Sequence, residues 1–489
     1  MNTATAAKDQ RLVKETRTRC PVCQADCPGE VWSRGTGPAS IWLDRVCPEH
    51  GRSTACLASD ARFYWQSQGE SGCGCRNPAS CGTDSDTAAA SIPAAPEDRF
   101  ESLSTCVALI EIVRSCNLPC PTCYANSPLG AHGSVDAVPL PELKSRIQGV
   151  LDRKGGIEIL QLSGGEPSLH PQLFELLEWA RDHDGIDYVL LNTNGLRLAN
   201  EAGFAARLGQ IFPKTGLQVY LQFDGVQLDG QHQLRGADLR ETRQRALRRC
   251  GEANIPATLA MTVTPANLDH LWAAIEFGLG FPHVHGITFQ PMFGSGRVPA
   301  PGGHGSAPTQ AHDHAHDHAH DHAHPAGTPA AALNVQTATE VREPEVPRLN
   351  VADVILSAVN HSGGRLRYED FTPLPCGDPN CATIGYLLRL EDGIRSISDF
   401  IDFRGLQGFL RDRLHYTLSD LAQCGCDNEP LGALLKSMEL KASMTFRIMV
   451  KPFMDAWTWD EHRIQRCCTH VIRPDGKLDS FCRYYASPA

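Results

Sequence analysis

Apolar residues between about positions 103 and 298 follow two alternating spacings. Continuous apolar runs, typical of buried strands, lie at 107–113, 157–162, 188–191, 219–223, 257–263 and 287–292. Between these runs, apolar residues recur every three or four positions, as expected for amphipathic helices near 140–151, 171–185, 201–211, 239–253 and 268–278. The succession of about six βα units predicts an α/β fold with a parallel sheet and outer helices, open or curled into a partial TIM-like barrel.

The flanking segments have a different composition. Eight cysteines lie in the first 81 residues, and an Ala-, Ser- and Pro-rich stretch follows them. Gly, Pro, Ala and His dominate 299–347, where an Ala-His-Asp-His repeat predicts disorder. We therefore expect a cysteine-rich N-terminal domain at 1–81, a linker at 82–102, the α/β core at 103–298, a disordered insert at 299–347 and a C-terminal domain at 348–489.

The overall composition is that of an ordinary globular protein. The length of 489 residues suggests about three domains. Hydrophobic residues make up 42% of the chain and charged residues 21%, which is close to average usage. A net charge of −11 argues against a general nucleic-acid binder. No apolar run reaches the ~18 residues of a membrane span, and the polar first residues contain no secretory signal, so we expect a cytoplasmic protein.

The cysteine content changes this picture. The chain has 20 cysteines, most of them in groups separated by one to four residues. Disulfide scaffolds are usually small and secreted, and this chain is neither. Ligation of metals or clusters in a reducing compartment is the better interpretation.

Three cysteines directly follow the first predicted strand. Cys116, Cys120 and Cys123 have the spacing C-x3-C-x2-C. Three thiolates on one loop can hold three irons of a [4Fe–4S] cluster and leave the fourth iron open for a ligand. The alternative is a zinc knuckle. A loop after a parallel strand lies at the carboxyl end of the sheet, where such folds bind ligands.

Other strand ends also carry candidate ligand-binding residues. The second strand ends in Gly164, Gly165, Glu166 and Pro167; paired glycines allow close approach to a ligand, and the carboxylate can accept an ammonium group. Later strand ends supply Asn194, Asp224 and Gln290. The alternative for these polar residues is turn formation, which Asn-Gly and Asp-Gly favour.

Taken together, these motifs on a six-βα pattern resemble the radical S-adenosylmethionine (SAM) superfamily over about 103–298. The resemblance implies that the three-cysteine loop binds a [4Fe–4S] cluster and that the open iron binds SAM. It implies contacts to SAM from Glu166 and the neighbouring glycines, with Tyr124 near adenine. Reductive cleavage of SAM then yields a 5′-deoxyadenosyl radical that abstracts hydrogen from an unactivated C–H. By the same analogy, a flavodoxin or ferredoxin supplies the electron.

Two further groups of cysteines predict additional metal sites. Near the N-terminus, Cys20, Cys23, Cys47 and His50 have the spacing of a mononuclear zinc or iron site, in which Cys27 or Cys56 is an alternative to His50. Near the C-terminus, a hairpin turn at 474–476 is expected to bring Cys467 or Cys468 close to Cys482. With Cys376 and Cys381 these residues predict an auxiliary [4Fe–4S] cluster, with a zinc site as the alternative. Cys73, Cys75 and Cys81 form a further group, which is either an accessory cluster or a set of free thiols, and Cys424 and Cys426 stay unassigned.

The order of all these motifs resembles one group of radical enzymes, which includes archaeal tetraether lipid synthase and a 7,8-dihydro-6-hydroxymethylpterin methylase. Two substrate classes follow: lipid chains, which need an apolar tunnel, and a pterin-like small molecule, which needs a polar pocket. The sequence does not separate them. The non-enzymatic alternative is a multi-cluster electron-transfer or metal-responsive protein. The histidine-rich insert either buffers divalent metals or is a solvated linker.

Overall fold

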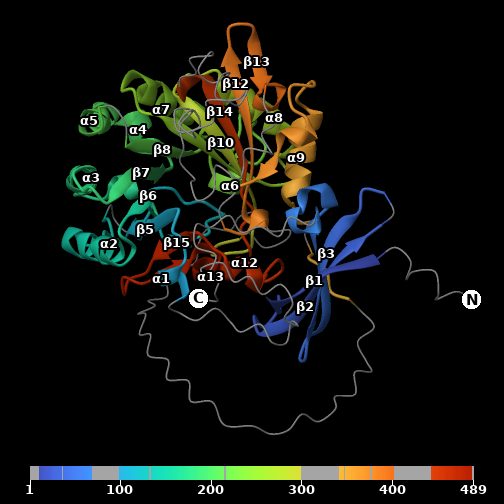
Figure 1. The fold of residues 1–489 in the computed structure, drawn as a ribbon. Coiled ribbons are helices and arrows are strands. Elements are labelled where there is room, and N and C mark those ends of the chain that lie inside the picture. The colour runs from blue at the N-terminus through green and yellow to red at the C-terminus, as the bar shows by residue number, and fades with distance from the viewer. Residues whose placement is uncertain are drawn as a thin grey trace, which may run out of the picture.

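The structure is a computed structural model, and it describes residues 10–68, 99–298, 341–400 and 442–486, apart from 36, 131–133, 214–215, 346 and 375–376. Within these residues the chain forms a small antiparallel sheet and one large sheet (Figure 1). The insert at 299–340 and Cys73, Cys75, Cys81, Cys376, Cys424 and Cys426 lie outside the described residues.

The N-terminal sheet is a four-stranded meander. Its strands are β1 (Gln10–Arg19), β2 (Asp26–Arg34), β3 (Ser40–Cys47) and β4 (Gly51–Ala58), each antiparallel to the next. The turns between β1 and β2 and between β3 and β4 therefore lie at the same end of the sheet. These two turns carry the predicted metal ligands. The short η1 (Ala61–Phe63) and η2 (Trp65–Gln68) follow.

Six parallel strands form the centre of the large sheet. They are β5 (Val107–Val113), β6 (Ile157–Gly164), β7 (Ile186–Thr193), β8 (Leu217–Gln222), β9 (Ala257–Val263) and β10 (Val284–Pro291), in that order. The connecting helices are α2 (Leu140–Lys154), α3 (Leu173–Arg181), α4 (Leu196–Asn200), α5 (Phe204–Ile211), α6 (Gln231–Arg235), α7 (Arg240–Glu252) and α8 (Leu271–Leu279). Figure 1 shows α2, α3 and α5 along the outer side of this sheet. The predicted α/β partial barrel is confirmed.

Helix α2 illustrates how the sequence forms these units. Leu143, Ile147 and Val150 are fully buried on one side of the helix, as the apolar spacing predicts. The helix ends at Gly155, whose φ of 77° is the left-handed conformation that glycine adopts freely. The Gly155 N–H donates to the Leu151 carbonyl at 2.7 Å, which satisfies one of the last helical acceptors.

Strands from the last third of the chain extend both edges of the sheet. Strand β14 (Thr445–Val450) lies parallel beside β10, and β12 (Thr383–Leu390), β11 (Thr372–Pro373) and β13 (Gly393–Ser396) follow antiparallel. At the other edge, β15 (Thr469–Ile472) lies parallel beside β5 and forms the predicted hairpin with β16 (Leu478–Ser480). The remaining helices are α1 (Arg99–Ser102), α9 (Val351–Asn360), α12 (Glu461–Gln465) and α13 (Phe481–Ala486).

The inner face of the sheet changes character along the strands. Near the amino ends, Val107, Ile159 and Tyr188 pack with Ile384 and Met449, which come from the opposite part of the sheet. This contact across the barrel identifies the face as the interior. Further along the strands, toward their carboxyl ends, the same face carries polar side chains. The strand registers place Glu111 beside Ser163, Asn192 beside Tyr220, and Thr262 beside Gln290. The barrel is apolar at one end and polar at the end where the strands finish.

Candidate functional site

The three-cysteine loop follows β5 and is clamped by the segment after β10. Cys123 and Arg297 exchange two backbone hydrogen bonds, both at 2.9 Å. The Arg297 side chain donates from Nε to the Cys120 carbonyl at 2.8 Å. On the other side, the Cys116 N–H donates to the Pro128 carbonyl at 2.8 Å. These hydrogen bonds fix both ends of the loop through its backbone and do not involve its thiol groups.

The thiols of this loop are half-buried, and the Arg235 guanidinium lies beside Cys120. Burial raises the pKa of Cys116 to about 12, and the negative charge of Glu166 adds to this effect. Burial also raises the pKa of Cys120, against the opposing effect of Arg235, which donates to the thiol. Buried thiols of this kind become thiolates when a bound metal supplies positive charge. Three thiols on one loop fit the cluster that the spacing predicts.

The glycine pair at the end of β6 lies against the start of the cysteine loop. A Cβ atom on Gly164 would lie 2.1 Å from the Val113 carbonyl oxygen, and one on Gly165 would lie 2.1 Å from the Ser115 oxygen. Gly164 also has a φ of 120°, which disfavours other residues. Glycine is required here for backbone approach, and the close approach brings the ends of β5 and β6 together.

Glu166 joins the ends of β6 and β7. Its side chain is buried, and Oε1 accepts hydrogen bonds from the Thr193 hydroxyl at 2.6 Å and the Ser168 N–H at 3.1 Å. Oε2 accepts from the Asn194 N–H at 2.7 Å. A carboxylate has about four acceptor positions, so one remains for an external ammonium group. Pro167 begins the short 3-10 helix that follows, Pro167–Leu169.

Asp224 and Asn194 occupy different surroundings. Asp224 is completely buried and forms a two-pronged pair with Arg235, at 2.6 and 3.0 Å. It therefore holds the cation that faces Cys120. Asn194 lies closer to the cluster loop: Nδ2 donates to Asn117 Oδ1 at 2.7 Å and lies 3.9 Å from Cys116 Sγ.

Tyr124 and Gln290 lie on opposite sides of the barrel mouth. The Tyr124 hydroxyl lies 3.2 Å from Ser163 Oγ, and its ring contacts the rings of Phe481 and Tyr485. Gln290 Nε2 donates to the Tyr220 hydroxyl at 3.0 Å. Both residues thus belong to the polar end of the barrel interior.

The structure also reveals a residue that the sequence prediction missed. Arg243 on α7 is completely buried, and its Nη1 and Nη2 have no hydrogen-bond partner among the described residues. Burial lowers its pKa to about 10, while the nearby negative groups Asp224, Cys120 and Glu166 oppose that shift. A sequence signal exists: Arg243 falls on the apolar stripe of α7 with Ala246, Leu247 and Cys250. Two unpartnered donors beside the cluster loop fit an anionic group of a ligand.

The N-terminal ligands come together as predicted. The ligand atoms of Cys20, Cys23, Cys47 and His50 all lie within 4.8 Å of one another. Burial alone would raise the pKa of Cys47, but hydrogen bonds from His50 and backbone amides lower it to about 6, which favours the thiolate. Four such ligands on two turns suit a tetrahedral metal site. Cys27 is buried beside this group but is not part of it, and Cys56 lines a separate cavity.

Three of the four predicted C-terminal ligands are described. Cys381, Cys467 and Cys482 lie close together. The charges of Cys381 and Cys482 shift the pKa of both Arg463 and Cys467. Burial raises the pKa of all three thiols, that of Cys482 to about 11. The β15–β16 hairpin thus brings Cys467 and Cys482 to one region, as the turn at 474–476 predicts.

Comparison with known proteins identifies the large sheet. The profile of the Radical SAM superfamily matches residues 110–278, which include β5 to α8 and the three-cysteine loop. Residues 110–278 are a radical SAM domain. The chain is accordingly a radical SAM enzyme, and a [4Fe–4S] cluster and SAM are the cofactors that this domain implies. The profile of the HMPTM N-terminal zinc ribbon domain matches residues 12–59, so the metal site at Cys20 to His50 is that of a zinc ribbon.

Similar proteins cover this radical SAM enzyme to different extents. The 7,8-dihydro-6-hydroxymethylpterin dimethyltransferase of Methanocaldococcus jannaschii is 23% identical over 97% of this chain and 93% of its own length. The GTP 3′,8-cyclase of Chlorobaculum tepidum is 33% identical over 18% of this chain and 26% of its own. The crystal structure of Streptococcus suis SuiB bound to S-adenosylmethionine is 13% identical, with a TM-score of 0.32 over 42% of this chain and 44% of that one. The chain thus spans nearly all of the first protein and less than half of the other two.

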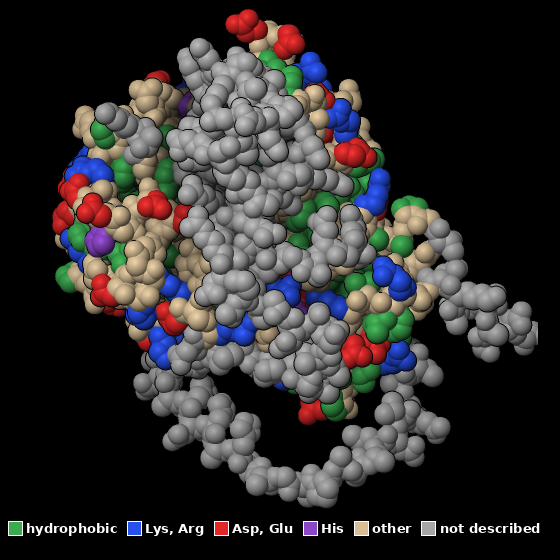
Figure 2. All heavy atoms as spheres, in the orientation of Figure 1, with side chains coloured by type: hydrophobic (Ala, Val, Ile, Leu, Met, Phe, Trp, Pro, Cys, Tyr) green, Lys and Arg blue, Asp and Glu red, His purple; other side chains and the backbone are tan. Residues whose placement is uncertain are grey.

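The surface of the radical SAM enzyme carries mixed charge. On the face shown in Figure 2, basic and acidic side chains are interspersed among the described residues. None of the described helices combines the length and hydropathy needed to cross a bilayer.

The ligand set of the zinc ribbon predicts which substitutions remove the zinc ion. Replacing Cys47 with alanine removes one of four ligands, and we expect the zinc content to fall from about one ion per chain to near zero. Replacing Cys27 with alanine removes a neighbouring buried thiol from outside the ligand group and should leave the zinc content unchanged. Metal analysis of both purified variants makes the comparison. Loss of zinc from the Cys27 variant alone would show that the ligand set is wrong.

Proposed function

We propose that this radical SAM enzyme alkylates, most simply methylates, a polar heterocycle of the pterin class. The observation that carries the proposal is the polar end of the barrel interior, where Glu111, Asn192, Tyr220 and Gln290 surround the space beside the cysteine loop. A lipid chain would need an apolar wall there, because polar side chains lose their contact with water when an alkyl chain covers them. The similarity to a pterin dimethyltransferase over 97% of the chain supports the same substrate class.

Different site residues would bind the cluster and the separate groups of SAM. Cys116, Cys120 and Cys123 would hold the cluster, and Arg235, oriented by Asp224, would donate to the Cys120 sulfur. Glu166 and the adjacent glycine backbone would take the ammonium group of SAM. The cluster and SAM, when bound, supply the reductive C–S cleavage that yields the deoxyadenosyl radical. Tyr124 and Asn194 would border the adenosyl group, and Gln290 would lie across the barrel on the substrate side.

Arg243 would bind the carboxylate of SAM. Replacing it with methionine should weaken SAM binding by roughly 10- to 100-fold, since a hydrogen bond to a charged group contributes about 1.5–3 kcal/mol. The free energy of unfolding should stay the same or rise, because an unpaired buried cation is removed. Arg248→Met, an exposed position on the same helix, is the matched control. Equal SAM affinity, by equilibrium dialysis, in the Arg243 and Arg248 variants would contradict the assignment.

The C-terminal thiols would hold an auxiliary cluster. Cys381 and Cys482 lie beside the Arg463 guanidinium, and Cys467 lies beside both of these thiols. With Cys376 they would supply four ligands. A buried cation beside thiolates stabilises their negative charge. An external donor of the flavodoxin or ferredoxin type would deliver the electron for the reaction.

The substrate is tested by transfer of a label. The reconstituted protein, a reductant and methyl-labelled SAM are incubated without oxygen with 7,8-dihydro-6-hydroxymethylpterin, and the pterin is analysed by mass spectrometry. Reductive cleavage leaves the methyl group of that SAM on methionine, so a second SAM would supply each transferred methyl. We therefore expect labelled methyl groups on the pterin, with one S-adenosylhomocysteine formed per methyl. Absence of label on the pterin, together with deoxyadenosine formation stimulated by isoprenoid lipids, would overturn the proposal in favour of lipid chemistry.

A further inference from the structure

A small cavity lies where the N-terminal sheet meets the large sheet. It has a volume of about 50 Å³. Its walls come from the end of β4, the end of η1 with the residue after it, the carboxyl end of β10, the start of α9 and the two loops around residues 380 and 460. The side chains that matter are Tyr64, Met292, Arg348, Asn380, Asp460 and Arg463. None of these residues is a proposed ligand of a cluster or of SAM, and Arg463 also lies beside the thiols of Cys381 and Cys482.

Three hydrogen-bond donors in this wall have no partner among the described residues. They are Nδ2 of Asn380, Nε of Arg463 and Nε of Arg348. Asn380 is 7% exposed and Arg463 is 8% exposed, so water outside the protein does not readily satisfy them. Buried polar groups are normally paired, so three unpaired donors around one cavity indicate a missing acceptor.

The other ends of these side chains are already fixed. Asn380 Oδ1 accepts from the Trp65 N–H at 2.8 Å, which determines that its NH₂ group faces the cavity. Arg463 Nη2 donates to the Pro452 carbonyl at 2.9 Å, and Arg348 Nη2 donates to Asp455. The donors are therefore held in place before any ligand arrives, as a preorganised site requires.

The charges around the cavity favour an anion. The one carboxylate in the lining, Asp460, is neutralised by Lys14 at 2.5 Å and accepts further bonds from Thr16 and the His462 N–H. Arg348 is paired with Asp455 in the same way, so Arg463 supplies the positive charge in the lining. The first residues of α9, Asn350 and Val351, also line the cavity, and a helix N-terminus favours negative charge.

The size limits what can bind. A volume of about 50 Å³ is far below the ~300 Å³ of a pocket for a whole small molecule. It suits one terminal group of the size of a phosphate or a carboxylate. We propose that this cavity binds a phosphate-like oxyanion through Asn380, Arg463 and Arg348, either as a free ion or as the end group of the substrate.

The cavity is connected to the active site by a short segment. Pro291 and Met292 line it, and Arg297, five residues further on, pairs with Cys123 of the cluster loop. Aromatic rings form a second connection: Phe453 in the cavity wall contacts Phe481 at 4.2 Å, and Phe481 contacts Tyr124 at 5.6 Å between ring centroids. Two ring contacts therefore separate the cavity wall from Tyr124 at the barrel mouth.

Asn380→Asp tests the assignment with little change in shape. The aspartate keeps the acceptor for the Trp65 N–H but replaces the inward donor with a negative oxygen. We expect inorganic phosphate to bind the full-length protein in titration calorimetry and raise its unfolding midpoint, and the Asn380→Asp variant to bind at least about tenfold more weakly. Asn360→Asp makes the same charge change at an exposed position on α9, and its phosphate affinity should match the native protein.

Two results would overturn the proposal. Absence of phosphate binding by the folded native protein would mean that the cavity holds ordered water only. Equal phosphate binding in the native and Asn380→Asp proteins would place the anion elsewhere. Neither readout depends on turnover, so failure of the proposed reaction would leave the cavity assignment standing.

A second comparison separates the two sources of the anion and rests on the proposed function. Deoxyadenosine formation is followed with 7,8-dihydro-6-hydroxymethylpterin and with its phosphate ester. If the substrate supplies the anion, the ester has the lower KM, and Asn380→Asp removes the difference. If the two compounds have the same KM while inorganic phosphate binds, the cavity takes a free ion and the end-group assignment is wrong.

Discussion

Replacing Cys116, Cys120 and Cys123 together with alanine is expected to abolish formation of 5′-deoxyadenosine and to remove the iron of one cluster. The three thiols are the proposed ligands on this loop, and their backbone is held independently by Arg297 and Pro128. The variant should therefore keep its fold and lose the cluster. Iron, sulfide and deoxyadenosine are measured in the same anaerobic sample.

Iron that remains in the triple variant reports on the C-terminal thiols. If Cys381, Cys467 and Cys482 take part in an auxiliary cluster, about four irons per chain should remain. Cys250→Ala removes a buried cysteine of α7 that lies in the hydrophobic core, so it should change neither iron content nor activity. Full iron and full deoxyadenosine formation in the triple variant would show that the cluster lies elsewhere.

Replacing Asp224 with alanine is expected to lower the free energy of unfolding by about 3–5 kcal/mol, because it leaves a buried cation without its partner. Asp224 is completely buried and accepts from Arg235 and Gln222 and from the Thr262 N–H. Its charge also fixes the guanidinium that donates to Cys120. The variant should therefore bind the cluster more weakly as well as unfold more readily.

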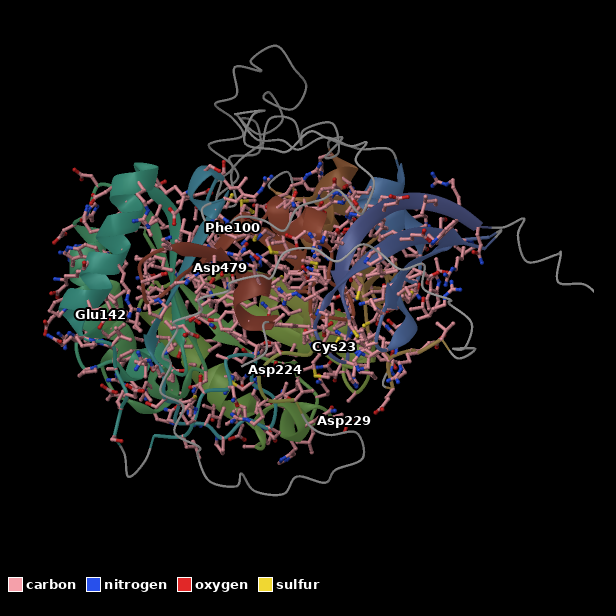
Figure 3. The ribbon with its side chains drawn as sticks, turned by 90° about the horizontal axis from the view of Figure 1, so that it is seen from below. Cys23, Phe100, Glu142, Asp224, Asp229 and Asp479 are labelled. Carbon is pink, nitrogen blue, oxygen red and sulfur yellow. The ribbon has the colours of Figure 1, made fainter. Side chains whose placement is uncertain are left out.

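The control lies five residues away. Asp229 is exposed, and Figure 3 shows it nearer the edge of the molecule than Asp224. Asp229→Ala should change the free energy of unfolding by no more than about 0.5 kcal/mol in urea titrations. Adding Arg235→Met to Asp224→Ala should recover part of the loss, since it removes the unpaired charge. A change below about 1 kcal/mol for Asp224→Ala would contradict the importance of the pair.

The sequence predicted well what depends on local spacing. Strand β9 has the predicted bounds, 257–263, because its apolar run is continuous and ends at polar residues. The cysteine loop and the zinc ribbon ligands follow from short spacings within single turns. Gly164 and Gly165 were recognisable because two glycines at the end of a strand indicate a place where backbones approach closely.

Features that depend on distant pairing were not predictable. Only 18 residues separate the end of β14 from the start of β15, yet the two strands join opposite edges of one sheet. No local pattern in the sequence specifies that β14 pairs with β10 and β15 with β5. The polar end of the barrel interior emerges only when the strand registers bring Glu111, Asn192 and Gln290 to the same face. Arg243 was missed because an arginine on a helix usually points to solvent, and its burial results from tertiary packing.

One measurement tests the central claim most directly. The native protein, with its clusters reconstituted and reduced without oxygen, is given SAM with and without 7,8-dihydro-6-hydroxymethylpterin, and 5′-deoxyadenosine is quantified over time. The account predicts that deoxyadenosine forms and that the pterin increases its rate. A full iron content with no deoxyadenosine under either condition would contradict the account and leave an electron-transfer or structural role for the clusters.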